Sequence, residues 1–351
     1  MSGNSYGKEF VITTFGESHG PGLGVIVDGM IPGVELSEED VQVQLRRRRP
    51  GQSLVCTPRF EADKVEIVSG IFEGKTTGTP IMMLIRNTSE RSRDYHDIKD
   101  IFRPGHADFT YNSKYGFRDY RGGGRSSGRE TAARVAAGAV AMKILEAEKI
   151  NILAYSLEIA GIRCEKVVPE AIEKNDVRAC DPDVAESMKE KIMAAMAEHN
   201  SVGGIVECCI SNVPAGLGEP VFDKLDAEIS KAVMSLGGVK GIEFGSGFAA
   251  AKMTGKEHND QIGPDGFLTN NAGGILGGIS SGQDIVFRLA VKPTASIAQA
   301  QKTIDKAGKA KECKVIGRHD PCLCPRMVPV VESMCAIVLA DMLLRHRARK
   351  V

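Results

Sequence analysis

Apolar and polar residues alternate in short runs along the first part of the chain, a pattern typical of half-buried strands. The pattern predicts four strands, at residues 10–14, 25–27, 64–69 and 80–85. Between the second and third, Ser37 followed by three acidic residues predicts a helix start, and Pro50-Gly51 ends that helix after a row of arginines. Strands and helices are therefore mixed from the beginning of the chain.

The middle of the chain interrupts this regularity. Residues 86–130 have little apolar periodicity and are rich in Arg, Asp, Gly and Tyr, which predicts a long active-site loop. An Ala-rich run at 132–148 and a charged run at 181–199 predict helices, and residues 150–162 and 203–210 predict strands. No linker divides the chain cleanly into two halves.

One combination of strand, Pro-containing turn and helix occurs twice. Residues 25–34 and the acid-rich helix after them resemble residues 208–217 and the helix predicted at 222–229. The similarity suggests a duplicated α+β unit, with chance similarity as the alternative.

Composition narrows the class of protein. The chain has 351 residues, of which 42% are hydrophobic and 26% charged, and 45 basic residues balance 45 acidic ones. This balance argues against binding nucleic acid or an acidic membrane by long-range attraction. The apolar helix predicted at 328–344 is interrupted by Glu332 and Asp341, which argues against a membrane span.

Cysteine usage and motif spacing argue against a metal site. The nine cysteines have neither zinc-site spacing nor a disulfide framework, so reduced thiols in a cytoplasm are expected. The N-terminus lacks the charged and apolar regions of a signal peptide. No H-x-x-x-H or paired C-x-x-C occurs, nor a Rossmann or P-loop fingerprint. We therefore expect a cytoplasmic protein with no metal, no nucleic acid and no membrane partner.

The most specific stretch is residues 121–130, RGGGRSSGRE. Three glycines permit positive φ and close approach of a ligand to the backbone. Ser127 and Glu130 have the spacing of a capping box, and the free N–H groups at a helix start attract anions. Residues 101–134 hold seven basic and three acidic residues, a local net charge of +4. The stretch predicts an anion site, with a flexible basic linker as the alternative.

Three residues are candidates for proton transfer. His19 lies in a glycine-flanked turn, where a local hydrogen-bonding role is the alternative. His106 lies among positive charges, which favour a neutral imidazole suited to accept or relay a proton. Asp341 is either a tuned carboxylate in an apolar helix or the i,i+4 ion-pair partner of Arg345.

Seven segments together resemble the chorismate synthase family. They are residues 16–20, 46–51, 103–106, 121–130, 271–282, 292–296 and 318–321. The resemblance runs from residue 9 to about 349, with the segments in the family's order. It implies an α+β fold, a β-α-β sandwich with internal pseudo-symmetry, in a single domain over residues 1–351 that assembles as a homotetramer.

The resemblance also implies a reaction. The family converts 5-enolpyruvylshikimate 3-phosphate to chorismate and phosphate by 1,4-anti elimination, a carbon–oxygen lyase step of the shikimate pathway of aromatic amino acid biosynthesis. Reduced FMN is required without net redox change. The chain lacks the long insertions of bifunctional fungal members, so an external flavin reductant is expected, with NADPH acting only indirectly. The alternative is a flavin-dependent NAD(P)H oxidoreductase that uses the same phosphate-binding loops.

Matching positions carry the family's roles onto this chain. His19 would protonate the leaving phosphate and His106 the reduced flavin. Asp341 would assist proton removal at the flavin N5, with Ser18 and Ser127 as helpers. The FMN contacts implied are Arg125, Ser126, Ser127, Gly237, Gly238, Gly277, Lys292, Pro293, Thr294, Ala295, Ser296 and Arg318.

Two arginines are implied on the substrate side. They are Arg48 and Arg129, and Arg48 is also a nucleotide (NADP) contact in the family, so its role stays open. Many members have an arginine where this chain has Leu54, and Arg59 is a candidate replacement. For residues 46–49, the alternative to ligand binding is a solvated helix end. For residues 318–319, it is a loop whose side chains bond backbone carbonyls.

Overall fold

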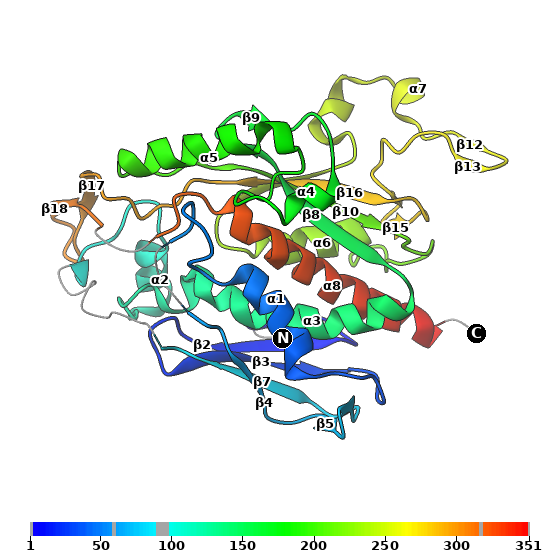
Figure 1. The fold of residues 1–351 in the computed structure, drawn as a ribbon, viewed down its shortest axis with the longest axis horizontal. Helices are drawn as coiled ribbons and strands as arrows, with labels where there is room; N and C mark the ends of the chain where they lie inside the picture. The colour runs from blue at the N-terminus through cyan, green and yellow to red at the C-terminus, as the bar shows by residue number, and fades with distance from the viewer. Residues whose placement is uncertain (1–2, 58–60, 89–97, 316–318, 350–351) are drawn as a thin grey trace.

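The computed structural model describes residues 3–57, 61–88, 98–315 and 319–349, which form two antiparallel sheets with helices between them (Figure 1). The first sheet has the order β1 (Ser5–Tyr6), β2 (Val11–Gly16), β3 (Gly22–Asp28), β7 (Ile81–Arg86) and β4 (Val65–Ile67). The second has the order β11 (Val239–Phe244), β16 (Ile285–Val291), β10 (Gly204–Ser211), β8 (Asn151–Ile159) and β9 (Ile162–Arg163). The predicted α+β sandwich is confirmed.

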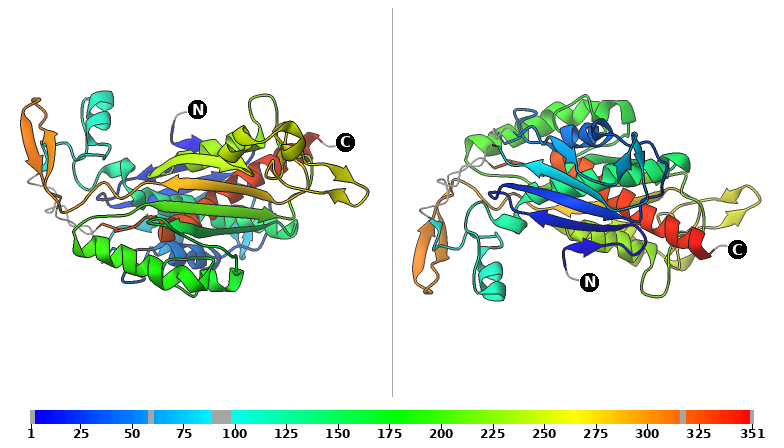
Figure 2. Two further views of the ribbon diagram at one scale, coloured as in Figure 1. Left: turned by 90° about the horizontal axis from the view of Figure 1, so that it is seen from above. Right: turned by 90° about the horizontal axis from the view of Figure 1, so that it is seen from below.

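Four helices fill the space between the sheets: α1 (Glu38–Arg48), α3 (Thr131–Ala147), α6 (Leu225–Met234) and α8 (Cys324–Arg349). α1 and α3 pack on the first sheet, α6 and α8 on the second, and α3 packs against α8 at the centre. Figure 2 shows the outer faces of the two sheets from above and below. Gly138 of α3 lies so close to Ser333 of α8 that a Cβ at position 138 would overlap the serine side chain. The Ala-rich sequence of α3 therefore permits this close central packing.

The two halves of the chain share one topology. In chain order, β2-β3-α1-β4-β7-α3 is repeated as β8-β10-α6-β11-β16-α8. In space, the strand order β2-β3-β7-β4 matches β8-β10-β16-β11. The duplicated unit predicted from the sequence is therefore confirmed, and it extends over both sheets.

The local signals around α1 explain its boundaries. The hydroxyl of Ser37 accepts from the backbone N–H of Asp40 at 3.4 Å, and the Asp40 carboxylate accepts from the Ser37 N–H at 2.8 Å. This capping box satisfies two donors that a helix start otherwise leaves unpaired. Three arginines in the last turn suit the negative end of the helix dipole.

The predicted loop at 86–130 has more regular structure than expected. It contains α2 (Asp108–Tyr115) and two 3₁₀ turns, η2 (Gly124–Ser126) and η3 (Gly128–Glu130). The sequence pattern missed α2 because its eight residues bury only Asp108 and show no apolar stripe. Tyr95 lies outside the described residues.

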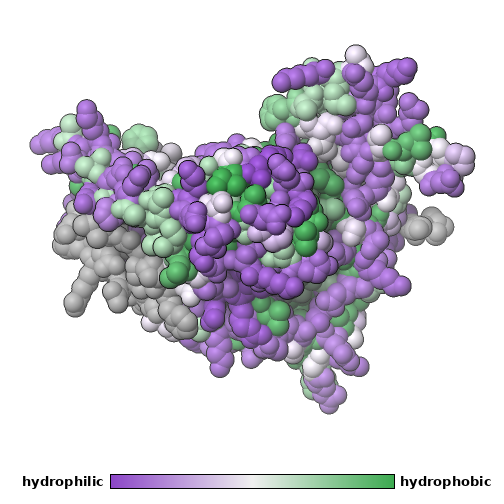
Figure 3. Space-filling view, turned by 45° about the horizontal axis from the view of Figure 1, so that its top comes forward, coloured by the Kyte–Doolittle hydropathy of each residue, from purple (hydrophilic) through white to green (hydrophobic). Residues whose placement is uncertain are grey.

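The remaining elements lie around the sandwich. The helical ones are α4 (Pro169–Ile172), α5 (Pro182–Ala197), α7 (Gly255–His258) and η4 (Gly247–Lys252). Four small hairpins are β5 (Ile71–Phe72) with β6 (Lys75–Thr76), β12 (Ile262–Gly263) with β13 (Gly266–Phe267), β14 (Ile275–Leu276) with β15 (Ile279–Ser280), and β17 (Gln301–Ile304) with β18 (Ala310–Cys313). The surface in Figure 3 is mostly hydrophilic, with hydrophobic residues in separate groups.

Among the described helices, α8 alone has the length and hydropathy of a membrane span. Its most apolar window is 94% buried inside the structure, as in the core helix of a globular protein. All nine cysteines are free thiols.

Candidate active site

A cavity of about 340 Å³ lies where the C-terminus of α1 meets the N-termini of α3 and α8. Five cationic side chains line it: Arg48, Arg103, Arg129, Lys292 and Arg326. Free N–H groups and the positive ends of two long helices add to this charge. The cavity is therefore suited to a small ligand with several negative charges.

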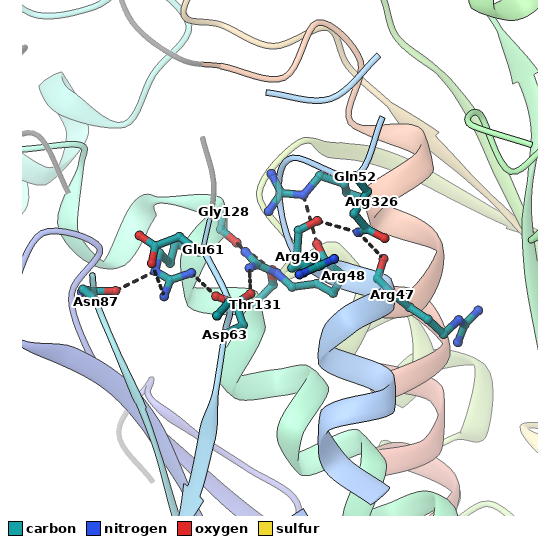
Figure 4. Close-up of polar contacts among 12 residues, drawn as sticks. Arg47, Arg48, Arg49, Gln52, Glu61, Asp63, Asn87, Gly128, Thr131 and Arg326 are labelled. Atoms are coloured by element: carbon teal, nitrogen blue, oxygen red, sulfur yellow. Dashed lines mark hydrogen bonds and ion pairs between the residues drawn. The ribbon is translucent and has the colours of Figure 1, made fainter. Parts of the chain in front are cut away.

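The two substrate-side candidates, Arg48 and Arg129, share one buried carboxylate, that of Asp63. Figure 4 shows Asp63 beside Arg48. Asp63 accepts from Arg48 Nη1 at 2.9 Å and from Arg129 Nη1 at 2.5 Å. All three side chains are almost fully buried. Burial lowers the pKa of Arg48 to about 9, reinforced by Arg326, while Asp63 opposes this shift. The same two arginines lower the pKa of Asp63 against the effect of burial.

Arg129 retains binding capacity beyond this pair. Its Nε donates to Asn87 Oδ1 at 2.6 Å, but its buried Nη2 has no hydrogen-bond partner among the described residues. Nη2 lies 3.7 Å from Oε2 of Glu61, beyond hydrogen-bond distance. A buried donor without a partner is costly, so an anionic ligand at this nitrogen would be favoured.

His106 is oriented from one side of its ring. Its Nδ1 lies 3.1 Å from Asp108 Oδ1 and 3.0 Å from Arg103 Nη2. Burial lowers the pKa of His106, Asp108 opposes this, and the charge of Arg103 lowers it further. The neutral imidazole expected from the flanking charge is thus favoured, although burial is the larger cause.

His19 and Ser18 lie in the turn between β2 and β3. The Ser18 hydroxyl is 3.0 Å from His19 Nδ1, and both side chains are buried. His19 and His106 both line the cavity, which brings together two candidates that are 87 positions apart in the chain. Ser126 and Ser127 line it as well.

Asp341 lies elsewhere. Its Oδ1 accepts from the backbone N–H groups of Lys8, Glu9 and Phe10 at 2.6–3.0 Å, and its Oδ2 lies 3.7 Å from Arg345. It lines a separate cavity. The structure therefore contains the Asp341–Arg345 ion pair, which was one of the two alternatives from the sequence. The role of Asp341 in proton transfer stays a prediction.

Asp320 is the acidic residue that lines the cavity, among the residues that the structure describes. Its Oδ1 accepts from Thr57 N at 3.0 Å and its Oδ2 pairs with Arg326 Nη1 at 2.5 Å. Arg326 Nε also donates to the carbonyl of Arg48 at 3.2 Å. The sequence analysis missed Asp320 and Arg326, although residues 318–321 had been singled out as a segment.

The glycine-rich tract contributes less charge to the cavity than predicted. Arg121 pairs with Asp119 at 2.8 Å, and Arg125 points toward β2, where it donates to Thr14 Oγ1 at 2.6 Å. Only Arg129 of the three predicted arginines lines the cavity. The tract approaches the cavity mainly through its backbone and serines.

The predicted capping box at Ser127 and Glu130 is wrong. Ser127 caps the 3₁₀ turn η3 by accepting from Arg129 N at 3.3 Å, and α3 begins only at Thr131. The Glu130 carboxylate pairs with Arg134 at 2.9 Å instead. The turn shifts the helix start by a few residues, so the two side chains no longer cap each other.

Most of the implied FMN contacts lie together. Gly237, Gly238, Lys292, Thr294, Ala295 and Ser296 line the cavity. Lys292 Nζ also donates to the Gly105 carbonyl at 3.3 Å, so the 292–296 segment adjoins the 103–106 segment. Pro293 instead packs near Gly203, and Gly277 lies in the open turn between β14 and β15.

Three other expectations concern Arg318, Arg59 and Leu54. Arg318 and Arg59 lie outside the described residues. Leu54, which stands where many family members have arginine, is 67% exposed and does not line the cavity. Among the described residues, no cluster of three or more His, Cys, Asp or Glu side chains could hold a metal ion.

Fold and site together define an α+β protein with a cationic cavity lined by three histidines, His19, His106 and His319, the arrangement of an enzyme for a small polyanionic substrate. The family model described as chorismate synthase matches residues 10–344. The chain belongs to the chorismate synthase family, whose members are carbon–oxygen lyases.

Individual relatives agree with this assignment. The chain is 55% identical to the chorismate synthase of Maridesulfovibrio salexigens, over 99% of both chains. It is 56% identical to that of Methanosarcina mazei, over 98% of this chain and 97% of the relative. A solved structure titled as a crystal structure of chorismate synthase superimposes with a TM-score of 0.78 at 33% identity, covering 97% of this chain and 93% of the other. Nothing in these matches supports the alternative of an NAD(P)H oxidoreductase.

Proposed function

We propose that the cavity converts 5-enolpyruvylshikimate 3-phosphate to chorismate and phosphate by 1,4-anti elimination in the presence of reduced FMN. The observation that carries the proposal is that His19, His106, Arg48 and Arg129 line one cavity. The chain's membership of the family supports the same reaction. Buried guanidinium groups suit phosphate and carboxylate because they bind both in a bidentate manner.

The residues present fit a flavin phosphate and an anionic flavin ring. Cationic side chains line the cavity, Arg129 has a buried N–H group to share, and Gly237-Gly238 leave the backbone open to a ligand. Ser126, Ser127 and residues 292–296 would hold FMN, together with Arg318. Reduced FMN, when bound, supplies a reduced ring that the reaction does not consume. Arg125 faces β2, so a direct contact with FMN requires it to turn.

The histidines would act as acid–base groups. To protonate the leaving phosphate, His19 would act as imidazolium: its Nδ1–H would donate to the Ser18 hydroxyl and its Nε2 proton would pass to the phosphate, which leaves the neutral ring. Asp108 and Arg103 fix the ring of His106 from its Nδ1 side, which leaves Nε2 to exchange a proton in the cavity. Arg48 and Arg129 would hold the substrate anions during both transfers.

We propose Asp320, rather than Asp341, as the carboxylate that assists proton removal, because Asp320 lines the cavity. Asp320→Asn should then lower kcat by about 10- to 100-fold, a usual range for a group that assists proton transfer. Asp341→Asn should mainly lower the melting temperature, because three backbone N–H groups would lose a charged acceptor. An Asp341→Asn enzyme with low kcat and an unchanged melting temperature would instead favour Asp341 as the carboxylate that assists proton removal.

Several finer properties belong to the same proposal. One hydrophobic core includes residues of both repeats, which supports a single domain over residues 1–351. Gly277 and Asp341 lie away from the cavity of their own chain. If either residue contacts FMN, it would do so in the cavity of another subunit, and we propose that the enzyme is a homotetramer. We also propose a cytoplasmic enzyme that relies on an external flavin reductant, with NADPH entering only through that reductant.

Anaerobic turnover tests the function directly. The protein, photoreduced FMN and 5-enolpyruvylshikimate 3-phosphate are mixed without NADPH, while chorismate and flavin absorbance are followed together. Many turnovers of chorismate per flavin, with the flavin still reduced at the end, are expected. Stoichiometric flavin oxidation, or product that forms only as NADPH is consumed, would instead favour an oxidoreductase.

A further inference from the structure

Two glycines of the tract lie directly against His19 and His106, two of the histidines that line the cavity. A Cβ at Gly122 would overlap Cε1 and Nδ1 of His19 and would lie 3.0 Å from Ser18 Oγ. A Cβ at Gly123 would lie 2.7 Å from Cε1 and 3.1 Å from Nε2 of His106. Both positions are therefore closed to any side chain while the rings stay where they are.

Neither ring can move aside without losing contacts. His19 is buried, and its Nδ1 lies within hydrogen-bond distance of Ser18. Only 16% of the His106 side chain is exposed, and its Nδ1 faces Asp108 and Arg103. A methyl group at either glycine would have to turn the neighbouring imidazole out of its hydrogen-bonded orientation.

We propose that Gly122 and Gly123 are positioning residues, each of which sets the orientation of one catalytic histidine by having no side chain. Gly122 acts on His19 and Gly123 acts on His106. The proposal rests on the acid–base roles proposed above for the two histidines. It gives the glycines a function in proton transfer in addition to the turn that they form.

Backbone conformation alone does not account for these two glycines. Gly122, Gly123 and Gly124 all have positive φ, at 65°, 97° and 54°, where any other residue is strained. Yet a Cβ at Gly124 would meet only Glu17 Cγ at 3.7 Å and Asp119 Cβ at 3.8 Å, which are ordinary contacts. Gly122 lines the cavity, whereas Gly123 and Gly124 do not. Gly124 therefore provides a matched control for Gly122, at a similar φ and with no histidine contact.

Alanine variants at the three positions separate the two effects. All three should lower the melting temperature, because each places alanine at positive φ. Gly122→Ala and Gly123→Ala should lower kcat at least about tenfold more than Gly124→Ala and shift the pH profile of kcat, because misplaced acid–base groups transfer protons poorly. In NMR spectra of protein labelled at histidine Cε1, Gly122→Ala should shift the His19 signal and Gly123→Ala the His106 signal. Equal losses of kcat in all three variants, with unmoved histidine signals, would overturn the proposal.

A double-mutant cycle covers the case in which Gly122→Ala folds poorly. In a His19→Ala background the space of the ring is vacant, so adding Gly122→Ala should cost no further rate and should destabilise less. A further loss of rate as large as in the wild-type background would overturn the proposal. If His19→Ala itself keeps the wild-type rate, the acid–base role fails, while the NMR shift still reports whether Gly122 places the ring.

Discussion

Replacing His106 or His19 by alanine lowers kcat by at least about 100-fold, the usual contribution of a positioned acid–base group. The fold should survive both changes, because both imidazoles border the cavity. Anaerobic steady-state kinetics with reduced FMN, together with melting temperatures, measure both effects. His258→Ala on α7 is the matched control and should keep the wild-type rate, because His258 does not line the cavity. Wild-type rates in both cavity variants would refute the two roles.

The pH dependence of kcat should reflect the protonation of His106. The pKa of His106 is lowered from its ordinary value of 6.5, chiefly by burial, so the neutral ring persists below that pH. If the neutral ring accepts the proton, kcat should fall on the acid side at a pH below about 6.5. Asp108→Asn removes the group that opposes this shift, so the acid limb should move to still lower pH. An acid limb that moves upward in this variant would contradict the assignment.

Asp63→Asn is expected to destabilise the protein by about 3–5 kcal/mol, the usual cost of leaving a buried charge without its partner. Two buried guanidinium groups depend on this carboxylate. Asparagine tolerates the left-handed backbone, so the substitution removes the charge with little added strain at φ 47°. Chemical denaturation measures the free energy of unfolding, and the KM for the substrate should rise because Arg48 and Arg129 lose their common anchor.

An exposed ion pair supplies the control for Asp63. Asp100 pairs with Lys306 at 3.0 Å, and its side chain is 58% exposed. Asp100→Asn should change stability by less than about 1 kcal/mol, as is usual for surface pairs.

Because the pKa of Asp63 is lowered in the folded protein, its contribution to stability is present above the ordinary aspartate pKa and is lost as the pH falls below it. A stable Asp63→Asn variant with unchanged KM would mean that the pair of arginines needs no shared counter-charge.

Features that depend on neighbouring residues could be predicted from the sequence. The start of α1 at Ser37 and its end before Pro50 rest on local capping and proline rules, and both are confirmed. The capping box at Ser127 failed for a local reason too, because η3 comes before α3. The position of an intervening 3₁₀ turn depends on packing that short motifs do not encode.

Contacts between distant segments could not be predicted in the same way. Asp63 joins Arg129 across 66 positions, and Asp320 joins Thr57 across 263. Asp341 shows the same limit, because α8 is buried on nearly every side and its sequence does not reveal which neighbour each polar group meets. The resemblance to a family implied which ligands to expect, whereas the fold showed which carboxylates contact the arginines.

The duplicated topology has a consequence for the origin of the site. The β7–α3 connection supplies His106 and Ser127, and its counterpart in the second repeat, β16–α8, supplies Lys292 and Asp320. Both equivalent connections place a histidine on the cavity, His106 and His319, and the second adds an ammonium group and a carboxylate. The smallest unit able to enclose a substrate is therefore the pair of repeats, and a single repeat would contain only one wall of the cavity.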